Sequence, residues 1–117
     1  MILAVLDDLM FSSKIKTAAK QLGVDLTFAR SADGALGEMR KAAPALVILD
    51  LNNPRTNPLA IVAAMKADAA LAAIPTVGYA SHVQTDVIQA ARQAGVGEVL
   101  ARSAFSERLG EILTRQV

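Results

Sequence analysis

Two stretches of the chain decide its fold: ILAVLDD at residues 2–8 and LVILD at residues 46–50. Each is an unbroken apolar run that is followed by acidic residues: Asp7 and Asp8 after the first run, and Asp50 after the second. Such runs are typical of parallel strands covered on both faces. If the two strands are neighbours, the three carboxylates lie together at the edge of the sheet where open α/β folds bind ligands. Carboxylates so close repel one another, and the cluster requires a cation or shared protons.

The composition is that of one globular domain over residues 1–117. Hydrophobic residues make up 53%, and 12 Lys and Arg against 11 Asp and Glu leave a formal net charge of +1. This balance, without a basic cluster, speaks against nucleic-acid binding. The absence of cysteine excludes disulfides and thiolate metal sites. The N-terminal apolar run is too short for a secretory signal and no run could cross a bilayer, so we expect a cytoplasmic domain that binds no membrane.

Beyond these stretches, short apolar runs alternate with segments of helical periodicity. The alternation predicts an α/β fold of five βα units, with a doubly wound five-stranded parallel sheet. The predicted strands cover residues 2–6, 24–29, 46–49, 76–80 and 98–101. A helix follows each strand; the third runs from Pro58 to about Leu71, and a single last helix directs Phe105, Leu109, Ile112 and Leu113 to the core.

Residues with known preferences for helix ends support these bounds. They are Gly23 after the first helix, Ser31 before the second, Asn57 before the third, and the pair Ser81 and Gln84, read as a capping box that opens the fourth.

Three short motifs lie at the ends of predicted strands: LDD at residues 6–8 after the first strand, LDLNNP at residues 49–54 after the third, and GVGE at residues 95–98 before the fifth. In these motifs and in the order of its elements, the chain resembles over its whole length the receiver domain of two-component response regulators. The resemblance implies a flavodoxin-like fold with the strand order 2-1-3-4-5, and a signalling module rather than an enzyme.

The resemblance also implies a chemistry for the acidic residues. Asp50 matches the aspartate that accepts a phosphoryl group from a histidine kinase or a phosphotransfer protein. Asp7 and Asp8 match the acidic pair that holds Mg²⁺, together with Asp50 and the backbone carbonyl of Asn52. Mg²⁺ prefers hard oxygen ligands, and a metal offsets the charge that develops when a carboxylate attacks a phosphoryl group.

The family's usual partner face implies a downstream protein or a second copy of the chain. It is formed by the fourth helix, the fifth strand and the last helix, and it carries a mixed, mildly basic set here: Arg92, Gln93, Arg108, Glu111 and Arg115. Mixed charge of this kind also keeps an ordinary surface soluble.

The departures from the family lie where phosphorylation is coupled to output. Ala80 stands at the end of the fourth strand, where the family usually has Thr or Ser. Val99 replaces the family's aromatic residue in the fifth strand, and Arg102 replaces the family's lysine after that strand. Ser103 replaces the next proline, so we expect a trans peptide, because a cis bond before a non-proline residue costs about 3 kcal/mol. Without a contact that differs between two states, phosphorylation shifts no population, and we predict weakened coupling. Ser81 would supply the missing hydroxyl only if the strand were displaced by one residue.

Simpler interpretations stand beside these. Asp7 or Asp8 could merely cap the first helix, where the helix dipole favours negative charge. His82 and Arg55 are expected at the surface, and Arg102 is expected to pair with Asp50.

Three kinds of function remain open. The first is a degenerate receiver domain in a phosphorelay, and the second is a phosphorylation-independent module for docking or dimerisation. The third is an enzyme or flavin binder on the same scaffold. Paired acids after the first strand would repel a flavin phosphate, and a dehalogenase-type phosphatase needs a second acid where this chain has Asn52.

Overall fold

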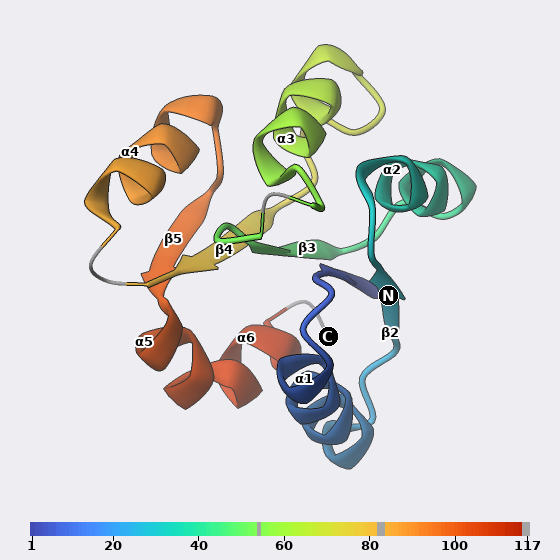
Figure 1. Cartoon of the computed structure of the whole chain (residues 1–117). Coiled ribbons are helices and arrows are strands. Elements are labelled where there is room, and N and C mark those ends of the chain that lie inside the picture. The colour runs from blue at the N-terminus through green and yellow to red at the C-terminus, as the bar shows by residue number, and fades with distance from the viewer. Residues whose placement is uncertain (54, 82–83, 116–117) are drawn as a thin grey trace.

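The computed structural model describes residues 1–53, 55–81 and 84–115. At its centre is a five-stranded parallel sheet in the order β2-β1-β3-β4-β5 (Figure 1). The predicted fold class and strand order are confirmed. The strands are β1 (Ile2–Val5), β2 (Leu26–Ala29), β3 (Leu46–Asp50), β4 (Thr76–Ala80) and β5 (Glu98–Ala101), and the helices are α1 (Leu9–Leu22), α2 (Ala32–Lys41), α3 (Pro58–Ala67), α4 (Thr85–Ala94), α5 (Arg102–Glu107) and α6 (Leu109–Thr114).

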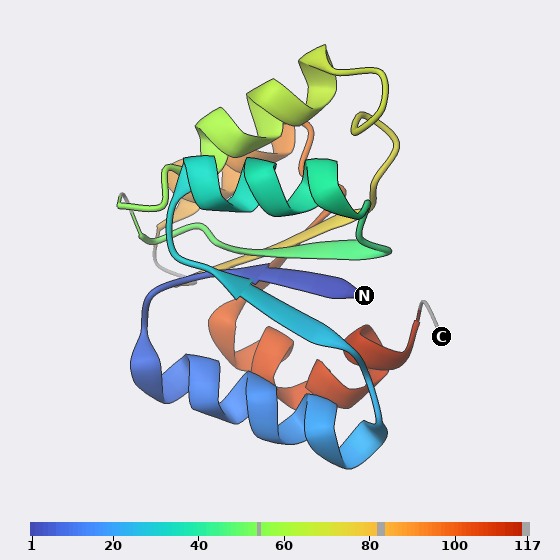
Figure 2. The same ribbon diagram turned by 90° about the vertical axis from the view of Figure 1, so that its right-hand side faces the viewer.

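The helices form one layer on each side of the sheet. Figure 1 shows α2, α3 and α4 on one face and α1, α5 and α6 on the other, and Figure 2 shows the same three layers from the side. Within the described ranges, no helix has the length and hydrophobicity that a membrane crossing needs.

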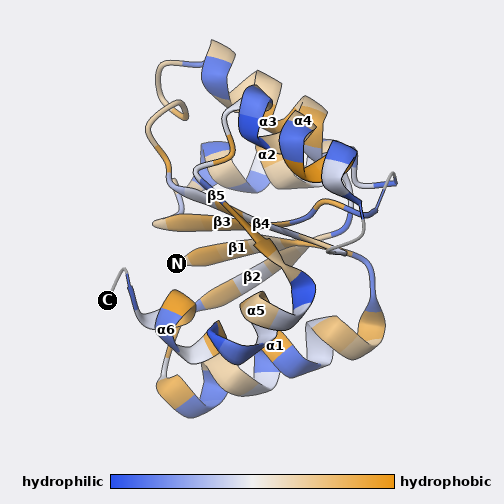
Figure 3. Ribbon diagram, turned by 90° about the vertical axis from the view of Figure 1, so that its left-hand side faces the viewer, coloured by the Kyte–Doolittle hydropathy of each residue, from blue (hydrophilic) through white to orange (hydrophobic). Residues whose placement is uncertain are grey.

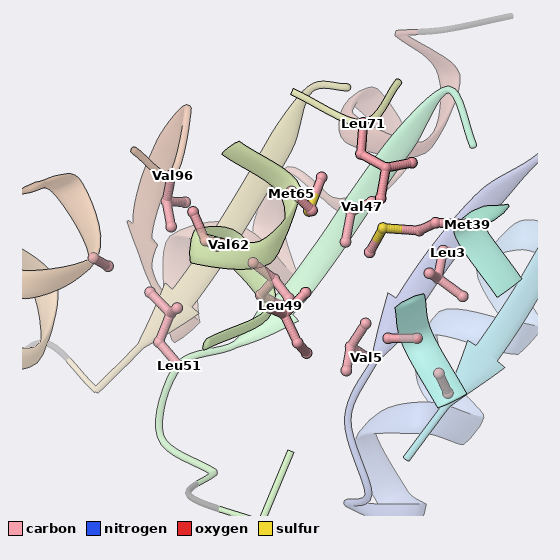
Figure 4. Packing of buried hydrophobic residues seen from close by; sticks show 14 of the residues in the cluster. Leu3, Val5, Met39, Val47, Leu49, Leu51, Val62, Met65, Leu71 and Val96 are labelled. Carbon is pink, nitrogen blue, oxygen red and sulfur yellow. The ribbon is translucent and has the colours of Figure 1, made fainter. Parts of the chain in front are cut away.

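Apolar side chains fill the space between the sheet and each helix layer. The central strands β1, β3 and β4 are buried along their whole length, which agrees with the apolar runs that predict β1 and β3. Figure 3 shows this hydrophobic centre between helices with polar outer turns. On the α2–α4 side, Val47 and Leu49 of β3 pack in one buried cluster with Met39 of α2 and Met65 of α3 (Figure 4). The edge strand β2 is only half-buried, as its alternating sequence predicts.

Most helix ends form where local signals predict them. The side chain of Asp8 caps α1, and Gly23 ends it in the left-handed region at φ 69°. The Ser31 hydroxyl accepts the N–H of Gly34 at 3.0 Å and caps α2. At α3 only the position agrees, because Asn57 itself adopts φ 49° and ψ 62°, and its side chain makes no cap bond.

The end of α3 differs from the prediction. The helix stops at Ala67, not near Leu71, although alanines continue the sequence. The carboxylate of Asp68 accepts the N–H of Ala70 at 2.9 Å, and a local bond of this kind competes with the next helical turn. Leu71 is nevertheless buried at 2% exposure.

Two further helix predictions are wrong. The capping box is absent: α4 begins at Thr85, and Gln84 occupies the cap position without a side-chain bond to the helix. The single last helix is two helices, α5 and α6, joined at Arg108 with φ −97° and ψ 11°. Gly110, a poor helix former, follows the break closely and weakens the helix there. The core-facing residues of this segment are buried as predicted, and they are Phe105, Leu109, Ile112 and Leu113.

Candidate functional site

The acidic residues meet at the carboxyl edge of the sheet because β1 and β3 are neighbours. The two strands pair in parallel with Val5 opposite Leu49, so the residues that follow them leave the sheet at the same edge. Asp50 ends β3, and Asp7 and Asp8 follow the end of β1 after one residue, Leu6. Their charges are close enough that Asp8 and Asp7 both help to raise the pKa of Asp50.

Asp50 is the most enclosed of the three acids, with 6% of its surface exposed. Burial raises the pKa of its carboxyl group above the ordinary value, because a charged group loses solvation there. The backbone N–H of Asn52 donates to Oδ1 at 3.0 Å, and this bond and the nearby Arg102 charge act in the opposite sense. The carboxyl group is thus held in one orientation by the loop that follows it.

Asp8 uses both of its carboxylate oxygens. Oδ1 accepts the N–H groups of Met10 at 3.0 Å and Phe11 at 3.1 Å, which caps α1. Oδ2 accepts from Nη2 of Arg102 at 2.8 Å. This bond is the main reason that the pKa of Asp8 lies below its ordinary value. The simpler interpretation, a cap of the first helix, therefore holds for Asp8, which also pairs with Arg102.

Asp7 is engaged by the loop after β3. Its Oδ1 accepts from the side-chain amide of Asn53, and its Oδ2 lies 3.7 Å from Nη1 of Arg55. The Arg55 side chain is 84% exposed, as expected of a surface residue, so this ion pair is strongly screened by water.

Arg102 does not pair with Asp50 as expected; its partner is Asp8. The chain passes directly from β5 into α5 at Arg102. This position brings the guanidinium group of Arg102 close to the amino end of α1, which Asp8 caps. There it lies over the ring of Phe11, 4.5 Å from the ring centroid, and 6.0 Å from that of Tyr79. The described backbone contains no cis peptide, so the bond to Ser103 is trans as predicted.

Asn52 connects two loops at this edge. Its side-chain carbonyl accepts the N–H of Ser81 at 2.6 Å, and its side-chain amide donates to Oε1 of Gln84. This contact explains why Gln84 does not cap α4. Sequence reasoning missed it, because the partners are 29 and 32 residues away and no local pattern marks them.

Of the three positions predicted to be degenerate, Ala80 and Val99 lie in apolar surroundings, whereas Arg102 is paired with Asp8. Ala80 ends β4 and is fully buried, and Val99 is half-buried against the cluster on the α2–α4 side. Because β4 ends at Ala80, the strand is not displaced, and Ser81 lies one residue beyond it. Ser81 does line an open depression together with Phe11 and Arg102.

The arrangement does not fit a divalent cation as it stands. Among the described residues, no three His, Cys, Asp or Glu side chains are placed to hold a metal ion. The oxygens of Asp7 and Asp8 are turned to the partners given above, whereas Mg²⁺ demands near-octahedral oxygen ligands. The expectations for His82 and for Pro54 of the LDLNNP motif lie outside the described residues.

Comparison with known proteins finds similar folds among solved structures. No protein-family model matches the chain, and no curated protein matches it. Among solved structures, a response regulator from Hahella chejuensis is similar at TM-score 0.87 and 23% identity, covering 99% of this chain and 93% of that one. The phosphorylated cyanobacterial phytochrome response regulator RcpA is similar at TM-score 0.80 and 24% identity, covering 96% and 86%. The Mn²⁺-bound form of response regulator Rcp1 is similar at TM-score 0.82 and 22% identity, covering 99% and 96%.

Proposed function

This chain has the fold of response-regulator receiver domains, and we propose that residues 1–117 act as one such domain in two-component signalling, with Asp50 as the phosphoacceptor. The observation that carries the proposal is the position of Asp50. It is an enclosed carboxylate at the ligand-binding edge of the sheet, beside two further acids. The donor would be a histidine kinase or a phosphotransfer protein, in the cytoplasm. The domain would serve as a signalling module rather than as an enzyme.

The geometry supports attack by one oxygen of Asp50. Asn52 binds Oδ1 through its backbone N–H, which leaves Oδ2 as the nucleophile. The bond from Oδ2 to phosphorus forms as the bond from phosphorus to the donor nitrogen or oxygen breaks, and the donor keeps that electron pair. The product is an acyl phosphate on Asp50. The positive charge of Arg102, which already acts on Asp50, favours the added negative charge.

The proposal includes weakened coupling to output. Ala80 has no hydroxyl to bond a phosphoryl group, and Val99 is too small to act as an aromatic switch. On the proposed partner face, Arg115 is bound to Glu98 at 2.9 Å and Arg108 to Glu111 at 3.0 Å. Much of the charge on that face is therefore engaged within the molecule, and a downstream partner or second copy would meet few free cations there.

Mass spectrometry tests the proposal. The protein is incubated with an acyl phosphate donor, and the intact mass is compared with that of Asp50→Asn. Asp33→Asn, an exposed change on α2, is the matched control. We expect one phosphoryl group on the wild type and the control, and none on Asp50→Asn. An adduct that persists in Asp50→Asn, or no adduct on any protein, would refute Asp50 as the acceptor.

The second candidate is a phosphorylation-independent docking or dimerisation module. One observation favours it: the oxygens of Asp7 and Asp8 already accept hydrogen bonds from groups within the molecule. The negative charge at this edge is therefore partly compensated without a bound ligand. Oligomeric state by sedimentation separates the two candidates. Phosphodonor-dependent association supports the receiver, and identical association of wild type and Asp50→Asn supports the docking module.

A further inference from the structure

We infer that Arg102 occupies the role that a divalent cation would play at this acidic edge, and that it excludes such a cation from the site. If the proposed function holds, phosphorylation of Asp50 then needs no metal; this second step rests on that function, whereas the exclusion of the cation does not.

The first argument is that both oxygens of Asp8 already have partners. Oδ1 accepts two N–H groups of the α1 cap, and Oδ2 accepts from Arg102 at 2.8 Å. Oδ2 keeps a second lone pair, but a cation placed there would lie beside the guanidinium and be repelled by its positive charge. Strong binding of a metal ion to Asp8 therefore requires displacing the guanidinium or uncapping the helix. Either step removes contacts that the folded protein already has.

The second argument is that Arg102 is held in place from several sides. Its guanidinium lies 4.5 Å from the centroid of the Phe11 ring, a distance at which a cation is attracted to an aromatic face. Phe11 is itself fixed by the ring of Tyr79 at 5.0 Å and the ring of Phe105 at 5.9 Å. A guanidinium suits this place better than an ammonium group, because it is planar, weakly hydrated and stacks on rings.

The third argument is charge. The three carboxylates at this edge carry three negative charges. Arg102 supplies one positive charge at 2.8 Å from Asp8, and the exposed Arg55, 3.7 Å from Asp7, adds a second that water screens. The formal sum of these two charges equals that of one divalent cation. The amide of Asn53 on Asp7 adds a neutral donor on the other side. The repulsion that would call for a metal is therefore offset by the chain's own side chains.

Titration with Mn²⁺ alone, followed by the electron paramagnetic resonance signal of the free ion, tests the inference. The proteins are the wild type, Arg102→Gln, which keeps much of the side chain without its charge, and the double variant Arg102→Gln with Asp8→Asn. We expect no binding by the wild type at millimolar Mn²⁺. Arg102→Gln should bind at least about tenfold more tightly, the order expected from losing a stacked ion pair of about 1.4 kcal/mol. The double variant should lose this gain.

Two results would overturn the inference: binding of millimolar Mn²⁺ by the wild type, or an Arg102→Gln variant that binds no better than the wild type. Thermal unfolding of each variant checks that it is folded, and Arg102→Ala provides a second replacement. Because no phosphodonor is present, failure of the Asp50 adduct leaves this result untouched. Where the adduct does form, equal yields in EDTA and in Mg²⁺ are expected for the wild type, and a yield abolished by EDTA would contradict metal-free phosphorylation.

Discussion

Tyr79 carries a buried hydroxyl group that has no hydrogen-bond partner among the described residues. The side chain is fully buried in β4, between the rings of Phe11 at 5.0 Å and Phe105 at 4.7 Å. Burial raises the pKa of the phenol far above its ordinary value, so the group is neutral at neutral pH. The substitution Tyr79→Phe removes only the unpaired hydroxyl and leaves the ring packing intact.

The expected effect is a more stable protein. A buried polar group left unpaired costs about 1–3 kcal/mol. Taking the lower end, Tyr79→Phe should raise the free energy of unfolding by about 1 kcal/mol. For a chain of this length, with an unfolding entropy of about 2.1 cal/mol/K per residue, this corresponds to a rise of about 4 °C in the melting temperature.

A second buried hydroxyl in the same strand provides the matched control. Thr76 is 4% exposed, and its hydroxyl accepts the N–H of Gly97 at 2.8 Å. Thr76→Val keeps the shape but leaves that N–H unpaired, and should lower the free energy of unfolding by about 1–2 kcal/mol.

Urea unfolding followed by circular dichroism measures both values. Opposite signs for the two variants are expected because only one hydroxyl has a partner. A loss of stability in Tyr79→Phe comparable to that in Thr76→Val would refute the reasoning, since it would mean that the Tyr79 hydroxyl is bonded.

Three further predictions concern the backbone, the α1 cap and the acceptor. A Cβ added at Gly97 would lie 3.0 Å from the backbone oxygen of Thr76, whereas one at Gly37 in α2 meets nothing within 4 Å. Urea unfolding should therefore show Gly97→Ala destabilised by about 1–3 kcal/mol and Gly37→Ala stabilised by up to about 1 kcal/mol; equal effects would contradict the close approach. Asp8→Ala should lose about 1–2 kcal/mol through the cap in the same assay, and Asp8→Asn, which can still cap, under about 1 kcal/mol. The raised pKa of Asp50 means that its charge opposes folding above that pKa, so Asp50→Asn should be more stable than the wild type at neutral pH, with a difference that shrinks as the pH falls through the pKa. A difference that is independent of pH between acid and neutral conditions would argue against a buried charge at Asp50.

The order of the strands along the chain and most helix ends could be predicted from local patterns, because unbroken apolar runs mark buried strands, and residues such as Gly23 and Ser31 mark helix ends a few positions away. The edge shared by the three acids was predicted only on the condition that the first and third strands are neighbours, which the family resemblance implied. Local patterns were insufficient where two weak signals competed. The alanines after Ala67 favour a longer α3, but the carboxylate of Asp68 ends it.

The partner of Arg102 was decided only in three dimensions. Asp8 and Asp50 are both acids at the same edge, and no spacing in the sequence distinguishes them as partners for a cation 94 residues from Asp8. The choice depends on Phe11, whose ring lies where β5 passes into α5 and guides the guanidinium to the helix cap. The sequence by itself determined that acids end two buried strands, because hydrophobic patterning marks the strands, and the family resemblance of its motifs implied that these strands are neighbours. Which of them bond to one another depended on packing between distant segments, and packing has no local signature.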